Sequence, residues 1–199
     1  KAWGNIYLNQ EVAPLLKIST PLSRDLVLQL KTGDRVLLGG EIYTARDAAH
    51  RRLLQDLARG ESPPFPLTGS VIYYVGPTPA PPGRIIGSAG PTTSYRMDPY
   101  TPELLARGVK GFIGKGFRSS TVREALQKEK GIYFAATGGA GALLARSIKE
   151  VEVIAYPDLG PEAIHRFFVE DMPLVVINDT YGGDLYRAGI AKYEVKEGG

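Results

Sequence analysis

Short apolar runs alternate with amphipathic segments along most of the chain. In the second half the order repeats as strand then helix: the apolar "VKGFIGKG" precedes the helical pattern of "TVREALQKEKG", and "IYFAATGG" precedes "GALLARS". The strand-like "IKEVEVIA" comes next, and then "PEAIHRFFVEDMPLVVINDT", which we interpret as helix followed by strand. The first half is richer in hairpin-like β segments broken by Gly and Pro. The pattern predicts an α/β fold with a mixed central sheet and flanking helices.

A helical pattern also follows "GGEIY" in the first half of the chain. Thr44 is a candidate N-cap, apolar residues at helical spacing form one face, and Gly60 ends the helix. The proline-broken connector that follows is the only hint of a domain boundary, and nothing repeats at a fixed period. We therefore expect one domain over residues 1–199, with residues 1–12 as an arm.

Composition narrows the possible functions. The chain has 199 residues, of which 43% are hydrophobic and 23% charged, as in an ordinary globular protein. With 24 basic against 21 acidic residues and no basic cluster longer than "HRR", no nucleic-acid partner is expected. No apolar stretch approaches the ~18 residues that span a bilayer, so we expect no membrane association and a cytoplasmic location.

The chain contains no cysteine. This excludes disulfides, thiol catalysis and any iron–sulfur cluster held by thiolates of this chain. The two histidines lie far apart and the carboxylates do not cluster, so no metal site is expected in this chain. A nucleophile-elbow motif is also missing, which leaves a Ser-His-Asp arrangement without support.

The segment "GSAGPTTSYRMDPY" (87–100) places hydroxyl and charged side chains directly after an apolar strand. Strand ends are where α/β sheets bind ligands, because side chains and free N–H groups converge there. Thr92 and Thr93 can hydrogen-bond a substrate, and Arg96 can bind a carboxylate. An equally good interpretation is a capped turn in which Arg96 pairs with Asp98. The residues alone leave both interpretations open.

Two further cations follow strand-like runs. Arg46, in "YTARDAAHRR", lies in the first turn of the expected helix, where the helix dipole assists anion binding; a solvated pair with Asp47 is the simpler interpretation. Lys115, between glycines in "GFIGKG", can approach a ligand closely, or is an exposed turn lysine. His50 is interpreted as structural. Arg46, Arg96 and Lys115 together suit a small dicarboxylate, although this chain offers no evident reactive centre.

A glycine turn, "ATGGAGALLARS", joins an expected strand to an expected helix. Gly138, Gly139 and Gly141 resemble a dinucleotide-binding turn, but the full G-x-G-x-x-G spacing is missing. Tight packing of the strand against the helix explains these glycines equally well. A module that binds a small anion or a nucleotide therefore remains an alternative function.

Several longer blocks carry a family resemblance. In chain order they are "GGEIYTARDAAHRRL", "GSAGPTTSYRMDPYTPELLARGVKGFIGKG", "AATGGAGALLARSIK" and "MPLVVINDTYGGDLY". From about residue 10 to about residue 188 the chain resembles the β subunit of class I (iron–sulfur) fumarate hydratase and the C-terminal domain of single-chain class I fumarases. The β subunit of L(+)-tartrate dehydratase is similar in the same way.

The resemblance implies a swivelling β/β/α domain and a lyase, a hydro-lyase acting reversibly on fumarate and (S)-malate in the tricarboxylic acid cycle. It also implies a partner α subunit whose three cysteines hold a 4Fe–4S cluster, so that no cofactor is bound by this chain alone, in an assembly of two α and two β subunits. Arg46, Arg96 and Lys115 are then expected to bind the substrate carboxylates, with Thr93 hydrogen-bonding and Thr92 moving the proton.

Alternatives remain within and beyond this resemblance. The substrate is equally well L(+)-tartrate, because both substrates need the same carboxylate contacts. A third hypothesis is an assembly subunit whose arginines form interface salt bridges. Tyr95 stands where the family is expected to have a small residue, commonly glycine. Its ring is expected either to shape the pocket or to point away from it.

Overall fold

The computed structural model of the chain describes residues 14–136 and 141–193. The expected arm, residues 1–12, and two of the turn glycines, Gly138 and Gly139, lie outside the described residues. The elements, in chain order, are β1 (Leu15–Ser19), α1 (Arg24–Gln29), β2 (Arg35–Thr44), α2 (Asp47–Ala58), β3 (Val71–Tyr73), the 3-10 turn η1 (Ser94–Met97), α3 (Thr101–Ala106), β4 (Gly111–Gly114), α4 (Ser120–Glu129), β5 (Ile132–Ala136), α5 (Gly141–Ser147), β6 (Ile148–Ala155), the 3-10 turn η2 (Pro157–Glu162), β7 (Ile164–Asn178) and α6 (Leu185–Tyr193).

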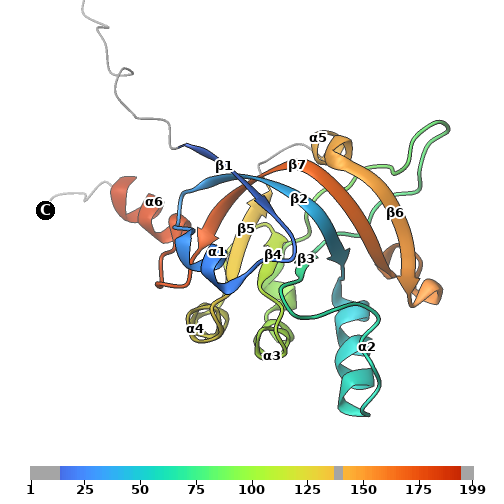
Figure 1. Cartoon of the computed structure of the whole chain (residues 1–199), viewed down its shortest axis with the longest axis horizontal. Helices are drawn as coiled ribbons and strands as arrows, with labels where there is room; N and C mark the ends of the chain where they lie inside the picture. The colour runs from blue at the N-terminus through green and yellow to red at the C-terminus, as the bar shows by residue number, and fades with distance from the viewer. Residues whose placement is uncertain (1–13, 137–140, 194–199) are drawn as a thin grey trace, which may run out of the picture.

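The strands form one mixed sheet that closes on itself (Figure 1). Strands β2, β3, β4 and β5 are parallel neighbours. The long strand β7 runs antiparallel to β5 on one side and to β2 on the other, which joins the two ends of the parallel set. Strand β1 pairs in parallel with the first half of β2, and β6 pairs antiparallel with β7. The expected mixed central sheet with flanking helices is confirmed.

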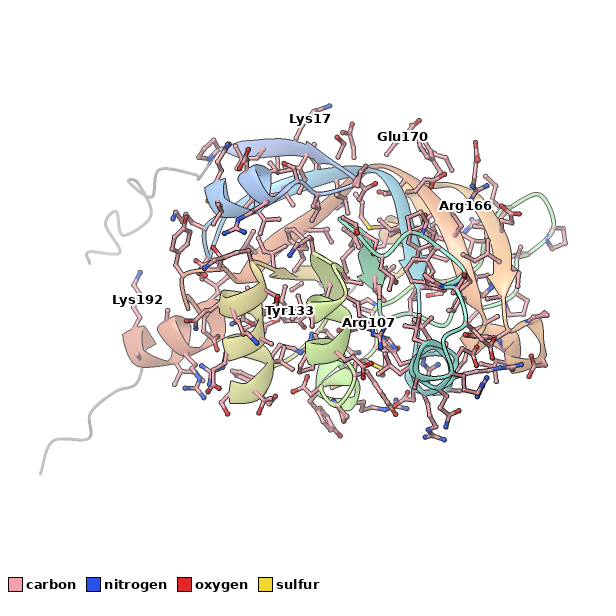
Figure 2. All side chains as sticks on the ribbon, turned by 60° about the horizontal axis from the view of Figure 1, so that its bottom comes forward. Lys17, Arg107, Tyr133, Arg166, Glu170 and Lys192 are labelled. Atoms are coloured by element: carbon pink, nitrogen blue, oxygen red, sulfur yellow. The ribbon has the colours of Figure 1, made fainter. Side chains whose placement is uncertain are left out.

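Alternate residues of the central strands enter two different cores, as the two-residue period of a strand requires. Val71 and Tyr73 of β3 and Phe134 of β5 point into the closed sheet, whereas Ile72 of β3 and Tyr133 of β5 face the helices. Figure 2 shows α2, α3 and α4 in a row across this outer face. Because both faces are covered, the strands consist of nearly continuous apolar runs. Burial of each such large side chain contributes roughly 1.5–3 kcal/mol.

Helix α2 begins differently from the sequence expectation. Thr44 is not its cap: it is the last residue of β2 and fully buried, and its Oγ1 accepts a hydrogen bond from the backbone N–H of His165 (2.9 Å). The cap is supplied by Glu162, whose carboxylate accepts the backbone N–H of Ala48 (3.1 Å). A partner so far along the chain leaves no local pattern. The expected end before Gly60 is confirmed, since α2 ends at Ala58.

The helix expected in the first part of "PEAIHRFFVEDMPLVVINDT" is wrong. Only the short turn η2 precedes Ile164, where strand β7 begins. Phe167 and Val169 are fully buried while Phe168 between them is 36% exposed, which is the alternation of a strand. Aromatic and β-branched residues favour a half-covered strand of this kind.

Candidate functional site

The carboxyl ends of the parallel strands meet at one edge of the sheet, and the predicted site residues follow these ends. Thr92 donates its backbone N–H to the carbonyl of Tyr74, just after β3 (2.7 Å), and its own carbonyl accepts the N–H of Lys115, just after β4 (3.3 Å). The backbone N–H of Ser94 donates to the Lys115 carbonyl (2.8 Å), which completes a parallel bridge between Thr93 and Lys115. Three of the five predicted residues are therefore fixed beside one another through the backbone.

Arg46 reaches the same edge from the end of β2. Its side chain lies directly over Gly76, so that a Cβ at this glycine would come within 2.8 Å of Nη1 and 3.1 Å of Cδ. Nη2 forms an ion pair with Glu162 (3.2 Å), and the side chain is 25% exposed. Nε is buried and has no hydrogen-bond partner within the described residues. Arg46 is thus held against the strand end with one donor unused.

Arg96 is bound to the start of helix α2. Its Nε and Nη2 donate to the two carboxylate oxygens of Asp47, at 3.1 and 2.6 Å. The predicted alternative, a capped turn in which Arg96 pairs with Asp98, is wrong because Asp98 is engaged elsewhere. The solvated Arg46–Asp47 pair is not formed either, since each residue binds a different partner. Arg96 is thus paired with the residue that follows Arg46 in the chain.

A buried arginine that no sequence pattern marked as functional supports this edge. Arg118 donates to Asp98 (2.7 Å), to the hydroxyl of Tyr74 (3.2 Å) and to Thr101 Oγ1 (2.6 Å), and its side chain is fully buried. The second oxygen of Asp98 accepts the Ser119 N–H (2.7 Å). This network ties the 92–98 segment to the segment after β4. The ion pair joins residues 20 apart, a separation without a local signal.

A pair of hydroxyls completes the support beneath the threonines. Tyr133 of β5 donates its phenolic O–H to the carbonyl of Gly116 (3.0 Å) and therefore accepts from Ser94 Oγ (2.8 Å). Burial raises the pKa of the Tyr133 phenol, so this group stays protonated. Ser94 thus has a structural role, whereas the side chains of Thr92 and Thr93 above it are half-buried.

Lys115 differs from the two arginines in having no counter-charge among the described residues. Its side chain is exposed, and its ammonium forms no hydrogen bond or ion pair with the part of the chain that the structure describes. The position therefore combines a fixed backbone with a free cation. Such a cation is available to an anionic ligand at the sheet edge.

Neither histidine offers a ligand or a base to this edge. His50 is fully buried, and burial lowers its pKa to about 4. Its Nδ1 lies 2.8 Å from the carbonyl of Arg46, which can only accept, so Nδ1 carries the proton and the buried Nε2 has no partner among the described residues. Burial also lowers the pKa of His165. The expectation of a structural His50 agrees with its burial.

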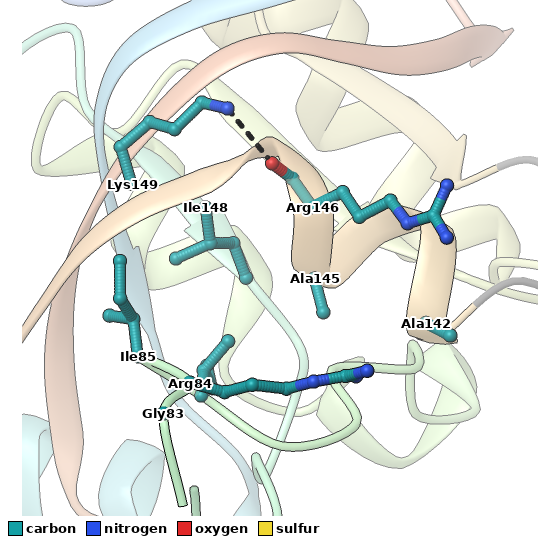
Figure 3. Close-up of a pocket in the computed structure, with 9 residues that line it drawn as sticks. Gly83, Arg84, Ile85, Ala142, Ala145, Arg146, Ile148 and Lys149 are labelled. Atoms are coloured by element: carbon teal, nitrogen blue, oxygen red, sulfur yellow. Dashed lines mark hydrogen bonds between the residues drawn. The ribbon is translucent and has the colours of Figure 1, made fainter. Parts of the chain in front are cut away.

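The glycine turn is described only at its end. A Cβ at Gly141 would lie 2.4 Å from Ser88 Oγ and 3.2 Å from the backbone nitrogen of Gly90, so this glycine allows close contact with the 87–90 loop. A pocket of about 340 Å³ lies beside α5, between that helix and the 83–86 loop (Figure 3). Arg84 and Arg146 line this pocket, and none of the predicted site residues does.

Tyr95 is an exposed aromatic residue next to Arg96 in the chain. Its side chain is 65% exposed, and that of Phe117 is 52% exposed. The two rings border a hollow of about 570 Å³ that is also lined by Pro99 and by Arg118 of the buried network. Of the two expectations for Tyr95, exposure favours the one in which the ring leaves the pocket.

Comparison with known proteins identifies the family of this chain. A family model described as the fumarase C-terminus matches residues 5–189. The chain belongs to this family. Among curated relatives, fumarate hydratase 2 of Leishmania major is 39% identical over 180 residues, which cover 89% of this chain and 31% of that protein. The aerobic class I fumarate hydratase of Escherichia coli is 39% identical over 176 residues, covering 87% of this chain and 31% of the relative.

The relatives of the fumarase C-terminal family differ in length. The chain spans about a third of the curated fumarate hydratases that it matches. A putative L(+)-tartrate dehydratase subunit beta of Methanocaldococcus jannaschii is 37% identical over 172 residues, and the match covers 83% of this chain and 88% of that subunit. Family members therefore occur both as separate subunits and as parts of longer chains.

Two further features are absent from the described residues. None of their helices is both long and apolar enough to cross a bilayer. Within the same ranges, no three His, Cys, Asp or Glu side chains gather as metal ligands.

Proposed function

We propose that this chain is the β subunit, or the corresponding C-terminal part, of an iron–sulfur hydro-lyase that interconverts fumarate and (S)-malate. One observation carries the proposal: in a chain of the fumarase C-terminal family, Arg46, Thr92, Arg96 and Lys115 lie at one edge of the sheet. Family membership makes the hydro-lyase class the best-supported reaction.

The cations match the charge that this reaction develops. Malate loses a weakly acidic proton from the carbon beside one carboxylate, and negative charge spreads into that carboxylate. Fixed cations around it stabilise this transition state more than the ground state. Lys115 is exposed and has no counter-charge in the described residues, and the Arg46 side chain is 25% exposed, so both can bind a substrate carboxylate. Arg96 supplies a planar fork that fits a carboxylate.

Thr92 is assigned to proton transfer. In dehydration its side-chain oxygen takes the proton from carbon while hydroxide leaves the neighbouring carbon, and in hydration the proton returns. A threonine hydroxyl is a weak base, and a cation close to it favours its ionised form. The Thr92 carbonyl accepts the backbone N–H of Lys115, and Lys115 forms a bridge with Thr93, so the backbones of these residues are adjacent. Thr93 is assigned a hydrogen bond to the substrate.

The 4Fe–4S cluster implied by the family does not fit the donor groups of this chain. The sequence contains no cysteine, and the described residues hold no group of three metal-ligating side chains. We therefore assign the cluster to the partner polypeptide that completes the enzyme. The residues of this chain bind and orient the substrate and hold the proton.

L(+)-tartrate is the second candidate substrate. The tartrate dehydratase subunit beta from Methanocaldococcus jannaschii is matched over 88% of its length, far more than the matched fumarate hydratases. Tartrate carries one more hydroxyl than malate, and the carboxylate contacts are the same. The residues at the sheet edge serve either substrate.

Reconstitution tests the proposal. The chain is combined with the cysteine-bearing α subunit that the proposal requires, iron and sulfide are added anaerobically, and fumarate and tartrate turnover are measured. We expect activity on one of the two from the pair and none from the chain alone. A pair that turns over neither would refute the hydro-lyase assignment. Tight binding of NAD to the chain alone, measured by calorimetry, would favour the nucleotide-binding alternative.

A further inference from the structure

Asp47 binds one particular edge of the Arg96 guanidinium. The two oxygens of its carboxylate accept from Nε (3.1 Å) and Nη2 (2.6 Å), which is the side edge of the planar group. Asp47 is the first residue of α2, where the helix dipole favours a carboxylate. Its side chain is 24% exposed and that of Arg96 is 41% exposed.

The contact with Asp47 uses two of the five N–H groups of the Arg96 guanidinium. A guanidinium has five N–H groups: one on Nε and two on each terminal nitrogen. Asp47 takes the Nε–H and one N–H of Nη2. Both N–H groups of Nη1 and the second of Nη2 remain, and Nη1 with Nη2 forms the end edge of the fork. This edge matches a second carboxylate in a bidentate contact.

We propose that Asp47 is a positioning residue for Arg96, which it holds by the side edge so that the end edge faces the substrate carboxylate. The inference rests on the proposed function. Arg96 lies on the four-residue turn η1 and is largely exposed, so without Asp47 its long side chain has many rotamers. Fixing the guanidinium before the substrate arrives lowers the ordering cost of binding.

A role of Asp47 as a competitor of the substrate would have the opposite effect on substrate binding. If Asp47 occupied Arg96 in place of the substrate, its removal would free the guanidinium and strengthen substrate binding. This competition is not required, because one guanidinium can bind two carboxylates at once, one on its side edge and one on its end edge. A surface ion pair adds little to stability, which makes a purely structural purpose a weak explanation.

The test uses the reconstituted enzyme and a double-mutant cycle. We expect Asp47→Ala to raise KM for the substrate about tenfold and to leave kcat within about twofold, since the substrate-binding group is still present but no longer oriented. Asp47→Glu should recover part of this loss. In an Arg96→Ala background, Asp47→Ala should change kcat/KM by less than about twofold, because there is no guanidinium left to orient.

A matched control is Asp25→Ala. Asp25 is an exposed acid in the first turn of α1, so the substitution changes the net charge and a helix start in the same way without touching Arg96. We expect its KM to equal that of the wild type. A lower KM in Asp47→Ala, or a loss that multiplies with that of Arg96→Ala, would overturn the inference. Full activity of Arg96→Ala alone would instead refute the proposed role of Arg96.

Discussion

At the scale of single residues, the predicted site divides into cations with and without a partner. Arg46 and Arg96 are each paired to a carboxylate of the chain, whereas Lys115 has none among the described residues. The sequence predicted these three residue types because each cation follows an apolar run. It could not predict their partners, since Glu162 lies 116 residues from Arg46 (162 minus 46) and Asp47 lies 49 residues from Arg96.

Replacement of Lys115 tests the free cation. Lys115→Met in the reconstituted enzyme is expected to lower kcat/KM by about tenfold or more, because a charged contact to the transition state is lost. The free energy of unfolding should stay within about 0.5 kcal/mol, as for other exposed positions. Lys128→Met on α4, also an exposed lysine, is the control for charge. Unchanged turnover in the Lys115 variant would remove this residue from the site.

His50 makes stability depend on pH. Its pKa is about 4 in the folded chain and 6.5 when unfolded, so between these values the unfolded state binds more protons. The stability is therefore complete above pH 6.5 and is lost as the pH falls toward 4. From pH 7.5 to pH 5 we expect a loss of about 2 kcal/mol from this group, measured by urea denaturation.

The variant His50→Phe isolates this effect. Phenylalanine retains a ring to stack on Tyr100 but does not titrate. The difference between wild type and variant in the free energy of unfolding should change by about 2 kcal/mol between the two pH values. A constant difference would mean that the imidazole is not held neutral.

At the scale of elements, Glu162 joins η2 to the start of α2. Its carboxylate accepts the Ala48 N–H and pairs with Arg46. Glu162→Ala removes both contacts, whereas Glu162→Gln retains an oxygen that can accept the N–H. We expect Ala to be about 1 kcal/mol less stable than Gln in chemical denaturation, the usual worth of a helix cap. Equal stabilities of the two variants would contradict the cap.

The strands were predicted better than their connections. The apolar runs "VIYY" and "IYFAA" are covered on both faces, so their composition alone indicated buried strands. The segment around Phe167 was misjudged because a strand with one covered face has exposed as well as buried aromatic residues, and Phe168 is 36% exposed. At the end of α4, Lys130 adopts the left-handed conformation (φ 54°), which glycine adopts most readily.

At the scale of the whole molecule, the site edge adjoins an exposed aromatic surface. Tyr95 and Phe117 border one hollow. Tyr95 directly precedes Arg96 in the chain, and Phe117 lies two residues after Lys115. Large exposed aromatic side chains are typical of interaction surfaces. The match covers about 31% of the length of the curated fumarate hydratases. Under the proposed function, a further polypeptide completes the enzyme at this edge of the sheet. We expect that polypeptide to cover Tyr95 and Phe117.

Truncation of Tyr95 tests this surface. Tyr95→Ala should weaken association between this chain and the separately produced cysteine-bearing polypeptide by about tenfold in Kd, because a buried tyrosine in an interface commonly contributes more than 1.4 kcal/mol. Sedimentation measures the Kd, and the free energy of unfolding of the lone chain should not change. Phe168→Ala is the matched control, since Phe168 is an exposed aromatic that lines a separate hollow with Pro21 and Thr68. If the Phe168 variant weakens association and the Tyr95 variant does not, the partner binds another face, and the residues at the sheet edge lose their proposed access to it.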